Sequence, residues 1–185
     1  MRISLIVLAV AVAACGEDNA SSSGGVKNPN DVSGSSSSGS SPTGATASDF
    51  TARDVDGKTV KLSAYLGKNP IVLDFWATWC QPCVQEFPHL IKLYDANKGK
   101  GLVVLGIAMD GPESVANVAP FARRQQLTFP VLLDDDSHVA AIYNPKKSAP
   151  LTVLIDRKGR ITKIREGYNP GDEDFLAQDV AKILE

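Results

Sequence analysis

Short apolar runs alternate with segments of helical periodicity from residue 49 to the end of this 185-residue chain. This alternation predicts an α/β domain, in which helices cover a central sheet. Strands are expected at 71–75, 102–108, 129–133, 151–155 and 161–165, with two short strands forming a hairpin within 50–62. Helices are expected at 80–97, 112–126, 137–143 and 172–184, with a short turn at 63–66. The last two strands flank a tight turn that ends at Gly159, so the sheet should be mixed.

Two cysteines stand at the point where the strand at 71–75 gives way to a helix. Cys80 opens the helix expected at 80–97, and Cys83 follows three residues later, after Gln81 and Pro82. A helix N-terminus stabilises the thiolate, which is the reactive form of cysteine, so we expect a lowered pKa for Cys80. Cys83 lies on the same helical face, within reach of a disulfide bond. The pair therefore predicts thiol–disulfide exchange, in which Cys80 attacks and Cys83 resolves the mixed disulfide.

Other uses of a cysteine pair need ligands that the chain does not offer. A structural zinc site takes about four ligands, and there is no second cysteine pair. Covalent haem requires histidine directly after the second cysteine, where this chain has Val84. A copper carrier would need a wider cysteine spacing and a histidine ligand, and His138 alone does not supply that. We therefore expect no metal and no cofactor beyond the Cys80–Cys83 redox couple.

The residues around the cysteines resemble a known family. Residues 74–83 resemble the active-site segment of thioredoxins. They read Asp74-Phe75-Trp76-Ala77-Thr78-Trp79-Cys80-Gln81-Pro82-Cys83. Their continuation, Cys83-Val84-Gln85-Glu86-Phe87-Pro88, resembles the TlpA/ResA-like branch of the redoxin (AhpC/TSA) superfamily. The resemblance covers 49–185, including an insert at about 111–129 that plain thioredoxins lack. It implies a thioredoxin fold with an N-terminal β-hairpin and a central βα insert, and protein disulfides as substrates.

Two carboxyl groups are candidates for proton transfer at this site. Asp74 stands where thioredoxins keep a buried aspartate beneath the second cysteine, and burial would raise its pKa. Glu86 corresponds to a glutamate that the TlpA/ResA-like branch places near the cysteines. The strand at 102–108 offers no match for the lysine that pairs with the thioredoxin aspartate. A partly hydrated Asp74 at a strand end and a surface Glu86 on the helix remain the alternatives.

The resemblance also implies a substrate-binding surface. The bond between Ala149 and Pro150 is cis in this fold, and the Ala149 backbone would offer an edge to the substrate chain. Trp79 would flank the cysteines together with Gln81 and Pro82, although a core position for this tryptophan stays open.

The first 48 residues contain no folding pattern of a globular domain. Residues 1–14 predict a signal peptide, because a positive residue, Arg2, precedes a short apolar run. The run is far shorter than the roughly 20 residues that a membrane-spanning helix needs. Val12-Ala13-Ala14-Cys15 resembles a bacterial lipobox, which implies lipidation of Cys15; an ordinary signal peptide with an incidental cysteine is the alternative. Residues 15–48 are rich in serine and glycine and predict a disordered tether of roughly 30 Å. We therefore expect a lipid-anchored domain of a bacterial cell envelope, facing the periplasm or the exterior.

These features favour an enzyme that reduces protein disulfides. In relatives, the partners are disulfide-bearing envelope proteins and a membrane thiol transporter that donates electrons. The net charge of −2 and the lack of a basic patch argue against nucleic-acid binding, and we expect a monomer. Gln81 and Pro82 add no positive charge beside the thiolate, which favours a reductant. A disulfide oxidase or isomerase on the same residues is the first alternative; a peroxiredoxin-type peroxidase and a copper chaperone are weaker ones.

Overall fold

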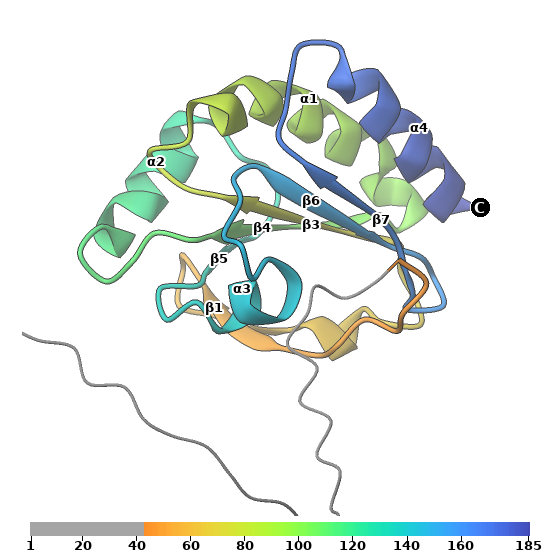
Figure 1. The fold of residues 1–185 in the computed structure, drawn as a ribbon, viewed down its shortest axis with the longest axis horizontal. Helices are drawn as coiled ribbons and strands as arrows, with labels where there is room; N and C mark the ends of the chain where they lie inside the picture. Colours follow the sequence, from red (N-terminus) through yellow and green to blue (C-terminus); the bar gives the residue numbers. More distant parts are fainter. Residues whose placement is uncertain (1–42) are drawn as a thin grey trace, which may run out of the picture. The chain divides into compact units, whose positions relative to one another are not determined.

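The computed structural model describes residues 43–185 of the chain (Figure 1). The expected signal peptide, Cys15 and most of the expected tether lie outside these residues. The packed domain begins earlier than the expected boundary at residue 49. The backbone N–H of Gly44 donates to the carbonyl of Ile161 at 2.6 Å, and that of Ala47 donates to Gly159 at 2.8 Å. These bonds attach the first described residues to the C-terminal hairpin.

Seven strands form one mixed sheet in the order β2-β1-β5-β4-β3-β6-β7. β3, β4 and β5 are parallel, and the other neighbouring pairs are antiparallel. This topology confirms the mixed α/β class and the N-terminal hairpin. The strands are β1 (Thr51–Asp54), β2 (Thr59–Lys61), β3 (Ile71–Trp76), β4 (Val103–Ala108), β5 (Val131–Leu133), β6 (Leu151–Ile155) and β7 (Ile161–Glu166).

Helices cover both faces of the sheet. Figure 1 shows α1, α2 and α4 on one side and α3 on the other. The helices are α1 (Gln81–Asn97), α2 (Val118–Arg124), α3 (His138–Tyr143) and α4 (Asp172–Leu184), with 3₁₀ turns η1 (Leu62–Ala64), η2 (Lys98–Lys100) and η3 (Val115–Asn117). No helix within residues 43–185 combines the length and the apolar character needed to cross a membrane.

The helix expected at 112–126 is shorter than predicted. Regular α-helix begins only at Val118, which places Pro120 in the first turn, where a missing N–H costs nothing. In a helix that began at Pro112, Pro120 would lie beyond the first turn. There its ring would clash with the backbone carbonyl four residues earlier. Pro88, in contrast, lies inside α1 without dividing the helix.

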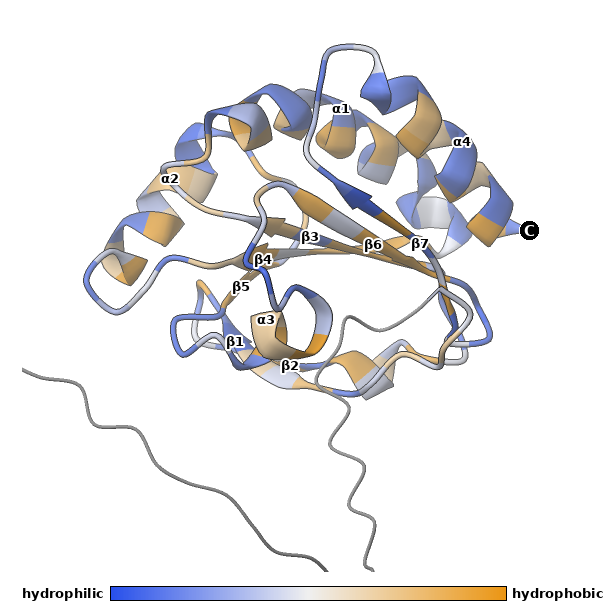
Figure 2. Cartoon of the chain, in the orientation of Figure 1, coloured by the Kyte–Doolittle hydropathy of each residue, from blue (hydrophilic) through white to orange (hydrophobic). Residues whose placement is uncertain are grey.

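Alternation along β3 decides which side chains reach the active-site helix. Leu73 and Phe75 pack in the core beneath α3, whereas Val72 packs with Leu90 of α1. Figure 2 shows apolar central strands between amphipathic helices. Because side chains alternate along a strand, Asp74 faces α1, on the same side as Val72.

Candidate active site

A four-residue turn links β3 to α1 and positions the first cysteine. The N–H of Cys80 donates to the carbonyl of Ala77 at 3.0 Å, which closes the turn directly before the helix. Cys80 is the N-cap of α1, and its Sγ accepts the N–H of Cys83 at 3.2 Å. The two cysteines form a disulfide. Since the first turn of α1 holds no acidic residue, the helix end can stabilise a thiolate on Cys80 in the reduced protein.

The surface next to the disulfide is partly apolar. The side chain of Trp79 is 65% exposed, so it is a surface residue and not part of the core. Gln81 and Pro82 are also exposed. The Ala149–Pro150 bond is cis, as expected, and Ala149 packs against the apolar cluster that contains both cysteines. The substrate-binding role of these five residues stays a prediction that this arrangement allows.

The two candidate carboxyl groups are both buried on the α1 side of the sheet. Asp74 is 1% exposed and Glu86 is 5% exposed. The alternatives of a partly hydrated Asp74 and a surface Glu86 are therefore wrong. Asp74 pairs with Thr152 of β6 in register, and Thr152 is also buried. On β4 the residue opposite Asp74 is Gly106, where a Cβ would already lie 3.0 Å from the rings of Phe129 and Trp76. A lysine therefore has no room there.

Burial perturbs the protonation of both groups. Burial raises the pKa of Asp74 well above its ordinary value, and the nearby charge of Glu86 raises it further. Burial also raises the pKa of Glu86 to about 7; a hydrogen bond with Thr152 lowers it, while the charge of Asp172 raises it. Within residues 43–185, Oδ1 of Asp74 has no hydrogen-bond partner. The pair can therefore hold or accept a proton near neutral pH, as a thiol–disulfide reaction requires.

Of the two buried carboxyl groups, Glu86 is the one that lines a surface pocket. It lines a pocket of about 250 Å³ together with Arg165, Glu166, Tyr168 and Asp172. Asp74 does not line this pocket. Glu86, whose charge acts on Asp74, is therefore the member of the pair that can exchange a proton with the pocket.

Three buried polar residues near the site were not predicted from the sequence. Thr152 interrupts the apolar run of β6, and that interruption was a usable signal. Asp110 follows β4 and accepts hydrogen bonds from Thr78, in the turn before Cys80. Asn144 holds the loop before the cis-proline, because its side chain bonds both the N–H and the carbonyl of Ser148. The contact between Asp110 and Thr78 joins residues that lie 32 positions apart, and no local pattern indicates that they are close.

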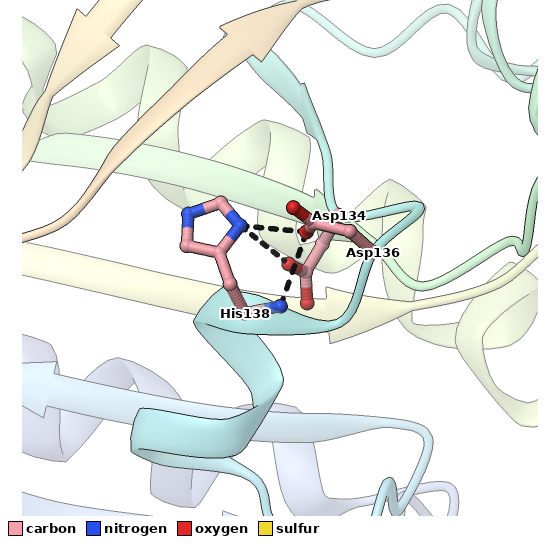
Figure 3. A group of neighbouring side chains, drawn as sticks. All are labelled: Asp134, Asp136 and His138. Atoms are coloured by element: carbon pink, nitrogen blue, oxygen red, sulfur yellow. Dashed lines mark hydrogen bonds and ion pairs between the residues drawn. The ribbon is translucent and has the colours of Figure 1, made fainter.

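A second polar cluster lies at the start of α3 (Figure 3) and consists of Asp134, Asp136 and His138. Both oxygens of the buried Asp134 accept backbone N–H groups of α3, at 2.9 and 2.8 Å. His138 Nδ1 lies 2.7 Å from Asp136, and its Nε2 lies 3.0 Å from the carbonyl of Thr51. Backbone N–H groups satisfy Asp134, and Asp136 and the Thr51 carbonyl occupy the two ring nitrogens of His138, so the cluster caps α3 and joins it to β1.

Fold and site together define a thioredoxin-fold protein of the thiol–disulfide oxidoreductase class. The chain belongs to the AhpC/TSA family, whose model matches residues 43–164. It is 39% identical over 132 residues to the thiol-disulfide oxidoreductase ResA of Geobacillus kaustophilus, covering 71% of this chain and 70% of the relative. The ResA of Geobacillus thermodenitrificans is 38% identical over 114 residues, covering 62% of this chain and 63% of the relative. The matched region thus spans about two thirds of these relatives.

Solved structures of similar proteins agree with this assignment. A putative thiol:disulfide interchange protein DsbE from Chlorobium tepidum matches 79% of this chain and 100% of its own, with a TM-score of 0.72 and 32% identity. A putative protein disulfide isomerase from Bacteroides thetaiotaomicron matches 77% of this chain and 90% of its own, with a TM-score of 0.69 and 33% identity. The thioredoxin fold and the ResA-like resemblance read from the cysteine segment are confirmed.

Proposed function

We propose that this chain reduces disulfide bonds in other proteins, with Cys80 as nucleophile and Cys83 as resolving thiol. The observation that carries the proposal is the Cys80–Cys83 disulfide at the N-terminus of α1, beside the exposed Trp79. The Cys80 thiolate attacks one substrate sulfur, and the other substrate sulfur leaves as a thiolate. Cys83 then attacks Sγ of Cys80 and releases the second substrate thiolate. Two electrons pass to the substrate, and the protein disulfide forms again.

The buried carboxyl groups serve the second step. Cys83 must lose a proton before it attacks, and Asp74 faces the helix that carries it. Glu86, with a pKa of about 7, is suited to pass this proton on to the pocket it lines. Asp74 therefore acts as the base and Glu86 as the exit for the proton.

The direction of exchange follows from the charges near Cys80. Strong oxidants of this chemistry stabilise the thiolate strongly, with a pKa of about 3.5 for the attacking cysteine. Gln81 and Pro82 add no positive charge beside the thiolate, and the buried carboxyl group of Asp74, which faces α1, adds none either. This balance supports a reductant over the oxidase or isomerase alternative.

The N-terminal pattern supports a location in the bacterial cell envelope. We infer that Cys15 is lipidated and tethers a monomeric domain, which faces the periplasm or the exterior. Envelope proteins with disulfides would be the substrates, and a membrane thiol transporter would return electrons to the Cys80–Cys83 disulfide. Cell fractionation tests the anchor: wild type should sediment with membranes and Cys15→Ser should not. Wild type in the soluble fraction alone would refute the anchor.

Trapping tests the assignment of the two cysteines. Cys83→Ser should accumulate mixed disulfides with substrate proteins, because the resolving thiol is missing. Cys80→Ser should trap none and should lose insulin reduction. Cys15→Ser is the matched control. It keeps Cys80 and Cys83, so it should reduce insulin like wild type and should not accumulate mixed disulfides. Equal trapping by Cys80→Ser and Cys83→Ser would contradict the proposal.

A further inference from the structure

A buried carboxylate outside the Asp74–Glu86 pair lies at the end of β4. Asp110 is 1% exposed, and no cation pairs with it in the described part of the chain. Removing a carboxylate from water without a counter-ion is costly unless hydrogen bonds compensate. The hydrogen-bond donors to Asp110 therefore indicate which part of the structure this buried carboxylate stabilises.

Both hydrogen-bond donors to Asp110 belong to one residue. Oδ2 of Asp110 accepts the backbone N–H of Thr78 at 2.9 Å, and Oδ1 accepts the Thr78 hydroxyl. Next to this contact, the N–H of Met109 donates to the carbonyl of Trp76 at 2.8 Å. The two residues that follow β4 thus hold the last residue of β3 and the turn that leads from β3 to α1.

Thr78 occupies a sensitive place in that segment. It is the second residue of the turn that Cys80 closes through its bond to Ala77. The next residue, Trp79, projects into solvent, and Cys80 follows as the N-cap of α1. The orientation of Thr78 therefore influences both the exposed tryptophan and the placement of the Cys80 sulfur at the N–H of Cys83.

We propose that Asp110 is a positioning residue for the exchange reaction. It holds Thr78 and so fixes the turn that presents Trp79 to the substrate and keeps Cys80 at the helix N-terminus. This inference rests on the proposed function and assigns to it a residue that touches neither sulfur. Because the carboxylate can only accept hydrogen bonds, it fixes the direction of both Thr78 donors, which an amide side chain would not.

Asp134 provides a matched control. It is also 1% exposed and also follows a parallel strand, but the backbone N–H groups that its carboxylate accepts belong to α3 and not to the turn before Cys80. Asp110→Asn and Asp134→Asn should both lower the urea concentration at which the protein unfolds. Only Asp110→Asn should change the active site.

The test measures Cys80 directly in the reduced full-length protein. Alkylation of the Cys80 peptide by iodoacetamide is followed by mass spectrometry across pH, and kcat/KM is measured for insulin reduction. Asp110→Asn should move the Cys80 alkylation midpoint to higher pH and lower kcat/KM at least about tenfold, since small displacements of reacting groups are costly. Asp134→Asn should leave both values unchanged.

Two substitutions at Thr78 keep the test decisive if Asp110→Asn does not fold. Thr78→Val replaces the hydroxyl with a methyl group and should shift the alkylation midpoint in the same direction, whereas Thr78→Ser keeps the hydroxyl and should have the wild-type midpoint. An unchanged midpoint in a folded Asp110→Asn, an unchanged midpoint in Thr78→Val where Asp110→Asn does not fold, or an equal shift in Asp134→Asn would overturn the inference. Wild type that fails to reduce insulin would refute the proposed function instead, while the alkylation profiles would still test the contact.

Discussion

Replacing Glu86 by glutamine should change how the stability of the protein depends on pH. Burial raises the pKa of this carboxyl from 4.5 to about 7. The folded state therefore binds a proton more tightly than the unfolded state does. Stability from this group is complete below pH 4.5 and is lost as the pH rises through about 7. At about 1.4 kcal/mol for each pKa unit, the loss is about 3 kcal/mol of unfolding free energy by pH 8.

Glu86→Gln removes this titration but keeps the shape and the polar contact to Thr152. At pH 8 the variant should be more stable than wild type by up to about 3 kcal/mol, and near pH 4.5 the two should differ little. Urea unfolding of the oxidised protein between pH 4.5 and 8 measures this difference. Glu113→Gln, at an exposed position away from the pocket, is the control and should follow wild type. A Glu86→Gln curve parallel to wild type across this range would refute the buried, protonated state.

Three further substitutions test other parts of the site and its surroundings. Asp74→Asn should slow resolution by Cys83 more than the first attack by Cys80, and stopped-flow kinetics that show no slower resolution would make Asp74 structural. Thr152→Val removes a hydrogen bond that lowers the pKa of Glu86, so the pH at which stability falls should move upward in urea titrations. His138→Ala should cost more stability at pH 5.5 than at pH 9, because its hydrogen bond to Asp136 raises the pKa of His138 and favours folding only while the imidazole is protonated.

The active-site segment could be predicted because its chemistry is local. The apolar strand, the turn and the cysteines at a helix start are contiguous, so hydrophobic periodicity and helix-end physics suffice to place Cys80 and Cys83. Sequence alone also placed Glu86 one turn after Cys83. It could not show that residues of β7 and α4 line the same pocket as this side chain, or that burial raises the pKa of Glu86.

The remaining features depend on contacts between distant segments. Asp110 meets Thr78 across 32 positions of sequence, because β3 and β4 are parallel neighbours whose ends lie together. The late start of α2 depends on which turn of the helix holds Pro120, and periodicity alone does not decide that. The packing of Gly44 and Ala47 against the C-terminal hairpin was likewise hidden in a glycine- and serine-rich stretch.

The reduction potential of the Cys80–Cys83 couple tests the central claim most directly. The protein is equilibrated with glutathione buffers of defined ratio, and its free thiols are then alkylated and counted. A reductant of the thioredoxin type should have a potential below about −200 mV, toward the −270 mV of thioredoxin. A value near −120 mV, typical of a strong oxidant, would contradict the account and favour a disulfide oxidase built on the same residues.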